Sequence, residues 1–589
     1  MKNSIGTTLA TLAIASLALG GCGGGGATSS ALPAPAPSSN GNVTASQAAF
    51  TCPSGDGTSS VASGTAASAS IVRRAPSRAA SHVAAASSGR IAVVYNGAAY
   101  SSAKASFEAN EQRAGAKLVR SFDYQSLGRV VRVLAVPPSQ TQSAIAALRA
   151  QAGVLNAAET GGRRWSLTAQ ANLVNNHYFD GYAPANTAPY YENATIPGQW
   201  DMHAIGLEHA FGYATSGNST GASHAGALGS HGVKLAVIDT GEDTLHPALG
   251  ANVVYQKCFI TGTNDAQSVG AYSTDQNGHG TDVAGIAAAV TNPASGLGFA
   301  GAGGDTAIMA YRVFPTPDDN CATPGSDDPQ CSADTADIAS AIDDTVSRGA
   351  NVISISLGGT SCTGNPSVNG GDPDPVEGAA IENAIAHNVI IVAASGNGSS
   401  ASIDAPACDA GVIAVGASAL ADGQPNGSAH AGGSAASPVE YVASYSNHGS
   451  PSSSPGCSGG SCATAWGIVA PGGDPTGSAD PDELHWIENL WTSTPFDGNF
   501  AGSCGSDFGT ASASDCRTLI AGTSQATPHV AGVAALVCAV DSGDCNPTAM
   551  KQLLCETAHD IGDPDEGCGR LDAYLAVAKA LGDSSPPSR

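Results

Sequence analysis

Four polar residues, far apart in the chain, are of the types that nucleophilic catalysis uses. Ser524 lies in "GTSQATPHVAG", His279 in "NGHGTDVAG", Asp239 at the end of "VKLAVID" and Asn397 at the end of "NVIIVAASGN". An imidazole can take the proton of a serine hydroxyl, and a carboxylate can hold that imidazole in place. An Asn amide can donate to the oxyanion that forms on attack. The set therefore predicts acyl transfer through a serine.

Each of these residues, taken alone, has a structural interpretation. Ser524 would be the N-cap of the helix that follows it, His279 a surface residue near a helix start, and Asp239 and Asn397 turn residues. The position of Ser524 at a helix start also suits a nucleophile, because the free N–H groups and the positive end of the helix dipole would face the oxyanion. Only the combination, in the order Asp, His, Asn, Ser, is specific.

The elements that must position these residues are strands and helices in alternation. Almost wholly apolar, β-branched runs, which are typical of strands buried on both faces, occupy residues 233–239, 351–359, 388–397 and 411–418. Small-residue or amphipathic segments between and after them predict helices at residues 279–290, 335–349, 377–387 and 525–540. This rhythm predicts an α/β fold with a mostly parallel sheet, in which functional groups gather at the carboxyl ends of the strands.

The front of the chain has a different organisation. Residues 1–21 have the charged start and apolar run of a secretion signal, and residues 22–89, mostly Gly, Ser, Ala and Pro, predict a flexible tether. Residues 90–165 give the order β-α-β-β-α-β of a small ferredoxin-like α+β domain. Residues 166–589 form the large domain, with a core at about 199–582.

The charge of the chain is divided between these regions. Residues 1–165 carry fourteen Lys or Arg against five Asp or Glu, whereas residues 166–589 carry nine against forty-four. We expect the basic front and the acidic body to attract each other, with Arg129, Arg132 and Arg149 as contacts. The acidic body argues against nucleic acid as a partner, because phosphate would be repelled.

The fifteen cysteines are compatible with disulfides in an exported protein. Pairing neighbours in the sequence would leave Cys258 over as a free thiol, although spacing alone does not fix connectivity. The pairs would be Cys321–Cys331, Cys362–Cys408, Cys457–Cys462, Cys504–Cys516, Cys538–Cys545 and Cys555–Cys568. No tight Cys/His cluster indicates zinc, so no metal ligands are assigned.

Two resemblances to known families follow from these motifs. "VIDTG", "HGTDVAG", "ISLGG", "ASGN" and "GTSQATPHVAG" resemble the signature segments of subtilisin-like serine peptidases, from about Gln199 to Leu581. The resemblance implies a seven-stranded-type subtilisin-like sheet, and residues 90–165 resemble the family's propeptide, an intramolecular chaperone and inhibitor. The end of the signal, "LGGC", resembles the lipobox of bacterial lipoproteins, which implies a lipid on Cys22.

The subtilisin resemblance assigns roles to the four residues. It implies that Asp239 orients His279, that His279 takes the proton of Ser524, and that Asn397 helps to hold the oxyanion of a serine endopeptidase. It also implies that Ser356, Leu357 and Gly358 pair with the extended substrate. The same segments, together with the stretch Ala394, Ser395 and Gly396, would flank the pocket for the residue before the cut.

The chain departs from the family at two positions near the nucleophile. The family usually has His where Asp282 stands. A carboxylate one turn after His279 would either stabilise the imidazolium or only face solvent, and we favour the second interpretation. The family usually has Met where Gln525 stands, and an amide is not an oxidation target as a thioether is. We therefore expect activity to survive mild peroxide.

Other classes of protein are compatible with parts of the sequence. An α/β-hydrolase esterase would need its Asp and His after Ser524, and a sedolisin-type peptidase would replace His279 with Glu. A non-catalytic surface lipoprotein or binding module is the main alternative from another class. We expect an exported monomer that acts on protein substrates, is inhibited by its own propeptide and is anchored to an outer membrane or secreted.

No cofactor is expected to be required. Calcium is common in the family as a structural ion, but the sequence shows no recognisable ligand loop for it. Side-chain specificity and the mature N-terminus, anywhere from near Arg164 to about Asn193, stay open.

Overall fold

A computed structural model describes most of the chain beyond the tether. The described residues are 89–165, 169–171, 199–216, 229–261, 267–270, 275, 277–290, 299–314, 332–359, 362, 372–421, 439–449, 465–474, 486–493, 503–504, 516–583 and 585–586. The signal, the tether with Cys22, and the expected pairs Cys321–Cys331 and Cys457–Cys462 lie outside them. Among the described residues, no helix has the length and apolar character needed to cross a membrane.

Residues 90–165, called here the small domain, contain the predicted β-α-β-β-α-β order. The elements are β1 (Arg90–Asn96), α1 (Gly97–Arg113), β2 (Lys117–Tyr124), β3 (Arg129–Ala135), α2 (Thr141–Arg149) and β4 (Val154–Glu159). Their strands form an antiparallel sheet in the order β2-β3-β1-β4.

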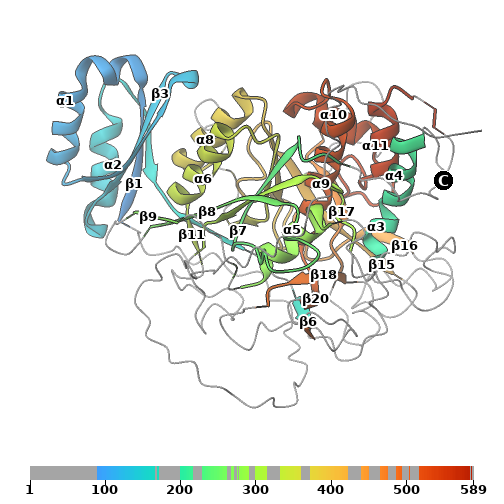
Figure 1. Cartoon of the computed structure of the whole chain (residues 1–589). Helices are drawn as coiled ribbons and strands as arrows, with labels where there is room; N and C mark the ends of the chain where they lie inside the picture. The colour runs from blue at the N-terminus through green and yellow to red at the C-terminus, as the bar shows by residue number, and fades with distance from the viewer. Residues whose placement is uncertain are drawn as a thin grey trace, which may run out of the picture. The chain divides into compact units, whose positions relative to one another are not determined.

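Strand β1 is apolar on both faces because both faces of its sheet are covered. Ile91, Val93 and Tyr95 pack with side chains of α1 and α2. Ala92 and Val94 belong instead to the core that includes α6 (Thr335–Ser347) and α8 (Pro375–Ala386) of the large domain. Figure 1 shows α1 and α2 on one side of the small sheet, and α6 and α8 on the other. The small domain therefore uses its second face for contact with the large domain, called here the body.

The body is built on a nine-stranded sheet in the order β16-β15-β14-β12-β7-β10-β8-β9, with β17 also paired to β15. Its strands are β7 (Lys234–Asp239), β8 (Val253–Thr261), β9 (Gln267–Gly270), β10 (Ala307–Arg312), β12 (Val352–Ile355), β14 (Ile390–Ala394), β15 (Ile413–Ala421), β16 (Val439–Val442) and β17 (Ile468–Pro471). β9 and β16 pair antiparallel, and the remaining seven strands are parallel. The predicted α/β fold with a mostly parallel sheet is confirmed.

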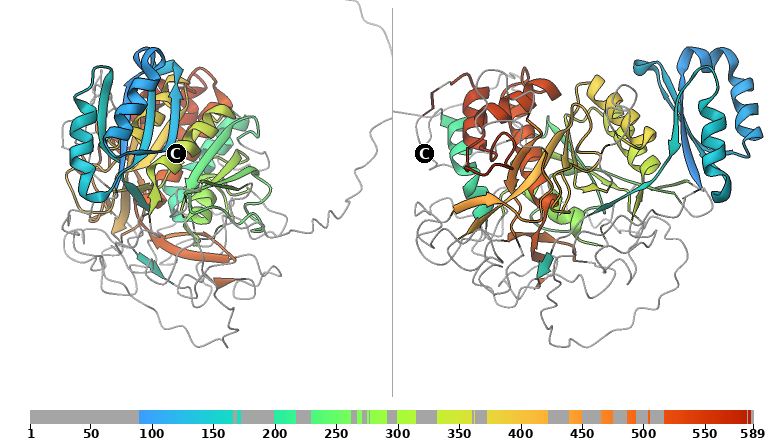
Figure 2. Two further views of the ribbon diagram at one scale, coloured as in Figure 1. Left: turned by 90° about the vertical axis from the view of Figure 1, so that its left-hand side faces the viewer. Right: turned by 180° about the vertical axis from the view of Figure 1, so that it is seen from behind.

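Helices cover both faces of this sheet, which explains the apolar strands. One face, with Leu235 and Val237, packs against α3 (Trp200–Ala204), α4 (Leu207–Ser216), α5 (His279–Ala288), α9 (Thr523–Val540), α10 (Pro547–Thr557) and α11 (Ala573–Ala580). The other, with Ala236 and Ile238, packs against α6 and α8. Figure 2 shows the same layers from behind. Successive residues of β7 thus enter different cores, as the two-residue period of a strand requires.

Two further sheets contain short strands from the front of the chain. β5 (Gly162–Trp165) lies between β11 (Ala333–Asp334) and β13 (Leu357–Gly358). β6 (Ala169–Ala171) pairs with β20 (Cys516–Ala521), which also pairs with β18 (Ile487–Trp491) and β19 (Ser503–Cys504).

Four of the expected disulfides are present: Cys362–Cys408, Cys504–Cys516, Cys538–Cys545 and Cys555–Cys568. The expectation of a free thiol at Cys258 is wrong, because this cysteine is itself disulfide-bonded, to a cysteine that is not among the described residues. Nearest-neighbour pairing failed here because a strand residue meets its partner through the fold rather than along the chain.

Candidate active site

Asp239 and His279 meet where a strand ends and a helix begins. Asp239 is the last residue of β7 and His279 the first of α5, and Nδ1 of His279 lies 2.7 Å from Oδ1 of Asp239. Both side chains are fully buried. Burial acts to lower the pKa of His279, but the Asp239 carboxylate acts to raise it, and the pKa is raised on balance. The carboxylate therefore holds the ring and favours its protonated form.

The start of α5 is fixed by Asp275, a residue that the motif analysis missed. Its carboxylate accepts backbone N–H bonds from Asn277, Gly278 and Thr281, at 2.9, 2.8 and 3.0 Å, and a hydroxyl bond from Thr281 at 2.6 Å. Gly278 has φ 113°, and a Cβ there would lie 2.1 Å from the ring of Trp491. Asp275 lies three residues before the N-cap Gly278, so the usual N-cap signal does not identify it from the sequence.

Ser524 is the second residue of α9, not its N-cap. The helix begins at Thr523 after Gly522, two residues before the predicted start at Gln525, so the alternative interpretation of Ser524 as an N-cap does not hold. The N–H of Ser524 still belongs to the first turn. The Ser524 hydroxyl donates to the Ser356 carbonyl at 3.1 Å, and the Ser356 hydroxyl donates to the Ser524 carbonyl at 2.9 Å. Pro528, four residues later, has no N–H for that carbonyl, so Ser356 takes its place.

A buried side-chain pair joins the helices that carry His279 and Ser524. Nε2 of Gln525 donates to Oδ2 of Asp282 at 2.8 Å, and both residues are fully buried. The expectation that Asp282 faces solvent is therefore wrong: α9 covers it. Burial raises the pKa of Asp282 to about 7. The bond ties the first turns of α5 and α9 together and thus brings the elements of His279 and Ser524 to the same place.

Asn397 follows β14 and faces the start of α9. Its Oδ1 accepts from the backbone N–H of Thr523 at 3.0 Å and from the Thr523 hydroxyl at 2.7 Å. These bonds turn Oδ1 of the amide toward Thr523 and therefore turn its donor, Nδ2, to the other side. Asn397 thus contacts the residue directly before Ser524.

The six residues expected to bind substrate lie on two adjacent segments of the body. Leu357 and Gly358 form β13, next to Ser356, and pair with the small domain's β5. Ala394 ends β14, and the Ser395 hydroxyl donates to the Asn447 carbonyl at 2.7 Å. Gly396 has φ 107°, and a Cβ there would lie 2.3 Å from Asp404.

The chain from the small domain runs along this site in a defined direction. Because β5 and β13 are antiparallel, with Arg164 opposite Gly358 and Trp165 opposite Leu357, the carboxyl end of β5 points toward Ser356. Beyond a short connection, Ala169 pairs with Ala521, three residues before Ser524.

Charged contacts hold the small domain on the body, but not all of those expected. Arg120 binds Asp337 at 2.9 Å, and Arg129 binds Glu382 at 2.5 Å. Arg90 binds Asp334. The expectations for two other arginines are wrong, because their partners lie within the small domain: Arg132 binds Glu111, and Arg149 donates to the Ala157 carbonyl.

The described residues offer no group of three or more His, Cys, Asp or Glu that could hold a metal ion. Accordingly, no calcium ligands are assigned in this part of the chain.

Comparisons with known proteins place this geometry in a family. The sequence profile of the subtilase family matches residues 230–575, more than half of the chain. A thermophilic serine proteinase of Bacillus sp. (strain AK1) is 30% identical over 356 residues, which are 59% of this chain and 62% of that protein. Thermitase of Thermoactinomyces vulgaris is 28% identical over 348 residues, which are 59% of this chain and 88% of thermitase.

The fold agrees with the same assignment. The crystal structure of fervidolysin from Fervidobacterium pennivorans superimposes with a TM-score of 0.57 and 21% identity, covering 84% of this chain and 62% of that one. The resemblance drawn from the motifs is therefore confirmed at the level of the family. This chain belongs to the subtilase family.

Proposed function

We propose that the protein is an exported serine endopeptidase that uses Asp239, His279 and Ser524. The observation that carries the proposal is the buried 2.7 Å bond between Asp239 and His279. The Asp282–Gln525 bond supports it, because it joins the helices that bear the base and the nucleophile. Family membership supports the same chemistry.

In this mechanism Nε2 of His279 takes the proton of Ser524 as the hydroxyl attacks the peptide carbonyl, and the resulting imidazolium is stabilised by Asp239. The Ser524 N–H and Nδ2 of Asn397 donate to the oxyanion. His279 returns the proton to the leaving amine, which leaves an acyl-enzyme on Ser524. Water, activated by the same His279, then releases the product.

We also propose that the small domain is a propeptide that blocks this site until it is removed. The pairing of β5 with β11 and β13 supports this role, because an extended peptide that adds to a strand edge would occupy the same place. The exported state and a lipid on Cys22 are parts of the proposal that rest on the sequence of the first residues alone.

Cleavage of casein and of a small ester by the purified full chain tests the function. We expect the wild type to process itself and then to cut casein, and we expect Ser524→Ala to do neither. Cleavage of esters alone would favour an esterase. A wild type that cuts neither substrate and does not react with a serine-directed phosphonate would favour a binding module.

A further inference from the structure

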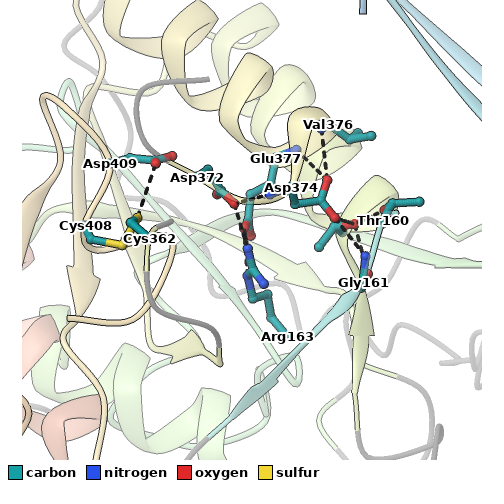
Figure 3. A network of polar contacts seen from close by, with 11 residues as sticks. Thr160, Gly161, Arg163, Cys362, Asp372, Asp374, Val376, Glu377, Cys408 and Asp409 are labelled. Atoms are coloured by element: carbon teal, nitrogen blue, oxygen red, sulfur yellow. Dashed lines mark hydrogen bonds and ion pairs between the residues drawn. A yellow bond between two sulfur atoms is a disulfide. The ribbon is translucent and has the colours of Figure 1, made fainter. Parts of the chain in front are cut away.

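Arg163, in the middle of β5, lies with its side chain buried among carboxylates of the body. Its Nε donates to Glu377 at 2.7 Å and its Nη2 donates to Asp372 at 2.9 Å. Only 2% of Arg163 is exposed, and none of Asp372 or Glu377. Figure 3 shows the guanidinium pointing from β5 into this group of carboxylates. The side chain is thus held as a ligand is held in a pocket.

The body itself positions the carboxylates of this pocket. Asp374 caps α8 by accepting from the N–H of Val376 at 2.9 Å, and its own N–H donates to Asp372 at 2.7 Å. Glu377 follows in the first turn of α8. The disulfide between Cys362 and Cys408 lies beside Asp409 (Figure 3). None of these constraints involves Arg163.

Arg163 supplies the positive charge among the carboxylates of this pocket. Burial, together with the neighbouring carboxylates Asp372 and Glu377, raises the pKa of Asp409 to about 10. Burial also raises the pKa of Glu377 well above its ordinary range, whereas Arg163 acts to lower it. Buried carboxylates that crowd together are costly unless a positive group is bound among them.

The geometry favours arginine over lysine. One oxygen of Glu377 accepts from Nε and lies 2.6 Å from Nη2, the two nitrogens on one edge of the guanidinium, while Asp372 accepts from Nη2. A planar guanidinium presents these donors in a fixed fork, whereas an ammonium is a single point of charge.

The backbone of β5 is held in the way that a substrate would be held. Its pairing with β11 and β13 uses main-chain groups, which every peptide has. In such strand addition the affinity comes from the main chain and the selectivity from side-chain pockets. Once β5 leaves, both the strand site and the carboxylate pocket become available to another chain.

We infer that Asp372 and Glu377 form a subsite for the guanidinium of an arginine in the peptide substrate, on the amino-terminal side of the bond that is cut. The inference rests on the proposed function and adds a substrate class to it: peptides with an arginine a few residues before the scissile bond. β5 would then be a built-in copy of the preferred sequence.

The test uses the processed wild-type enzyme and a fluorogenic peptide with the sequence of residues 160–172. In a second peptide, citrulline, which is neutral but of the same shape, replaces the arginine of position 163. We expect kcat/KM to fall about tenfold or more. As a matched control, citrulline at position 164 removes the same charge one residue away, and we expect little change.

Enzyme variants locate the effect. Glu377→Gln should reduce the discrimination between arginine and citrulline at position 163, because one of the two carboxylates that contact the guanidinium is lost. Glu382→Gln, on the same helix, should keep the discrimination. Equal kcat/KM for the two peptides with the wild type would overturn the inference and leave the proposed function intact, as would casein cleavage without cleavage of either peptide. Loss of casein cleavage and of phosphonate labelling would instead contradict the proposed function.

Discussion

Asp282 and Gln525 are two residues near Ser524 that differ from those usual in the subtilase family, and they contact each other. Asp282 lies one helical turn after His279, and Gln525 follows Ser524. Their bond is buried and spans 243 positions of sequence. Each residue was considered separately from the sequence, which is why Asp282 was expected to face solvent. A pairing between two helices is decided by tertiary packing and has no local signal.

The pH dependence of kcat/KM should show the effect of the Asp282 charge on the pKa of His279. His279 must be neutral to act as a base, so activity rises with pH as it loses its proton. The carboxylates of Asp239, Asp282 and Asp275 act to raise the pKa of His279. Asp282→Asn removes one of these charges but keeps an oxygen to accept from Gln525. The acid limb should therefore move to lower pH.

Because the pKa of Asp282 is raised to about 7, only a fraction of the wild-type enzyme carries this negative charge near neutral pH. The shift of the acid limb arises from that fraction. The exposed Asp560 supplies the control: Asp560→Asn should leave the acid limb where it is in the wild type. An acid limb unchanged in Asp282→Asn, or moved to higher pH, would contradict the argument.

Resistance to peroxide should depend on Gln525. The wild type has an amide beside Ser524, whereas Gln525→Met would place there a thioether that oxidises to a sulfoxide. We expect the processed wild type to keep its activity in mild peroxide and the variant to lose it, with mass spectrometry locating the added oxygen on the α9 peptide. Rapid inactivation of the wild type with a modification near Ser524 would show that the amide gives no protection.

The sequence predicted the individual strands and helices much better than the contacts between them. The predicted run that ends at Asp239 is a strand, the run 388–397 contains the strand Ile390–Ala394, and His279 begins a helix. These were predictable because hydrophobic period and small residues are local signals. The start of α9 was misplaced by two residues, since Thr523 rather than Gln525 is its first residue. The partner of Cys258 was beyond sequence reasoning, because it depends on which segments the fold brings together.

The contact between α5 and α9 should be sensitive to a single methyl group. A Cβ at Gly532 would lie 2.5 Å from the carbonyl of Ala287 in α5 and 2.7 Å from the N–H of Gly303, both of them backbone atoms. Gly532→Ala should therefore cost about 1–3 kcal/mol of unfolding free energy. Urea unfolding in a Ser524→Ala background, which prevents self-digestion, measures it.

Gly232→Ala is the matched control for this prediction, because the Cβ would meet only the flexible Ser230 hydroxyl. Its free energy of unfolding should stay close to that of the parent. Equal stability of the two variants would mean that α5 and α9 can move apart freely.

At the scale of the whole molecule, the small domain and the body share one core and one set of ion pairs. The charge asymmetry of the sequence pointed to such an association, but of the three arginines expected to contact the body only Arg129 does so. Arg129 forms an ion pair with Glu382 of the body, whereas Arg132 forms one with Glu111 within the small domain. Net charge gives the sign of an interaction between regions, whereas the surface position of each arginine depends on the strand face it occupies.

The first maturation cut should fall between Trp165 and Ala169. Trp165 pairs with Leu357, next to the Ser356 that contacts Ser524, and Ala169 pairs with Ala521. The two strands thus bracket Ser524, which narrows the range of mature N-termini from the one that the sequence left open, near Arg164 to about Asn193. N-terminal sequencing of the first processed form should show a start within this interval, at a rate independent of protein concentration. A first cut beyond Ala171 would contradict the bracketing.

Release of the small domain after that cut should depend on Arg120. Its guanidinium donates to the Ser340 hydroxyl at 2.6 Å and binds Asp337 at 2.9 Å, in a largely buried contact with α6. Arg120→Glu would place a carboxylate against Asp337, so the cut small domain should leave faster and the lag before casein cleavage should shorten. Lys104→Glu makes the same charge change on an exposed residue of α1 and should leave the lag unchanged.

Salt separates this electrostatic effect from a loss of folding in the variant. Added salt screens the partly exposed ion pairs of Arg90 and Arg129 more than the buried pair of Arg120, so the lag of the wild type should shorten as ionic strength rises. The lag of Arg120→Glu should respond less, because salt there also weakens the new repulsion between the introduced carboxylate and Asp337. Equal lags for wild type, Arg120→Glu and Lys104→Glu would mean that the shared apolar core, rather than the ion pairs, holds the small domain in place.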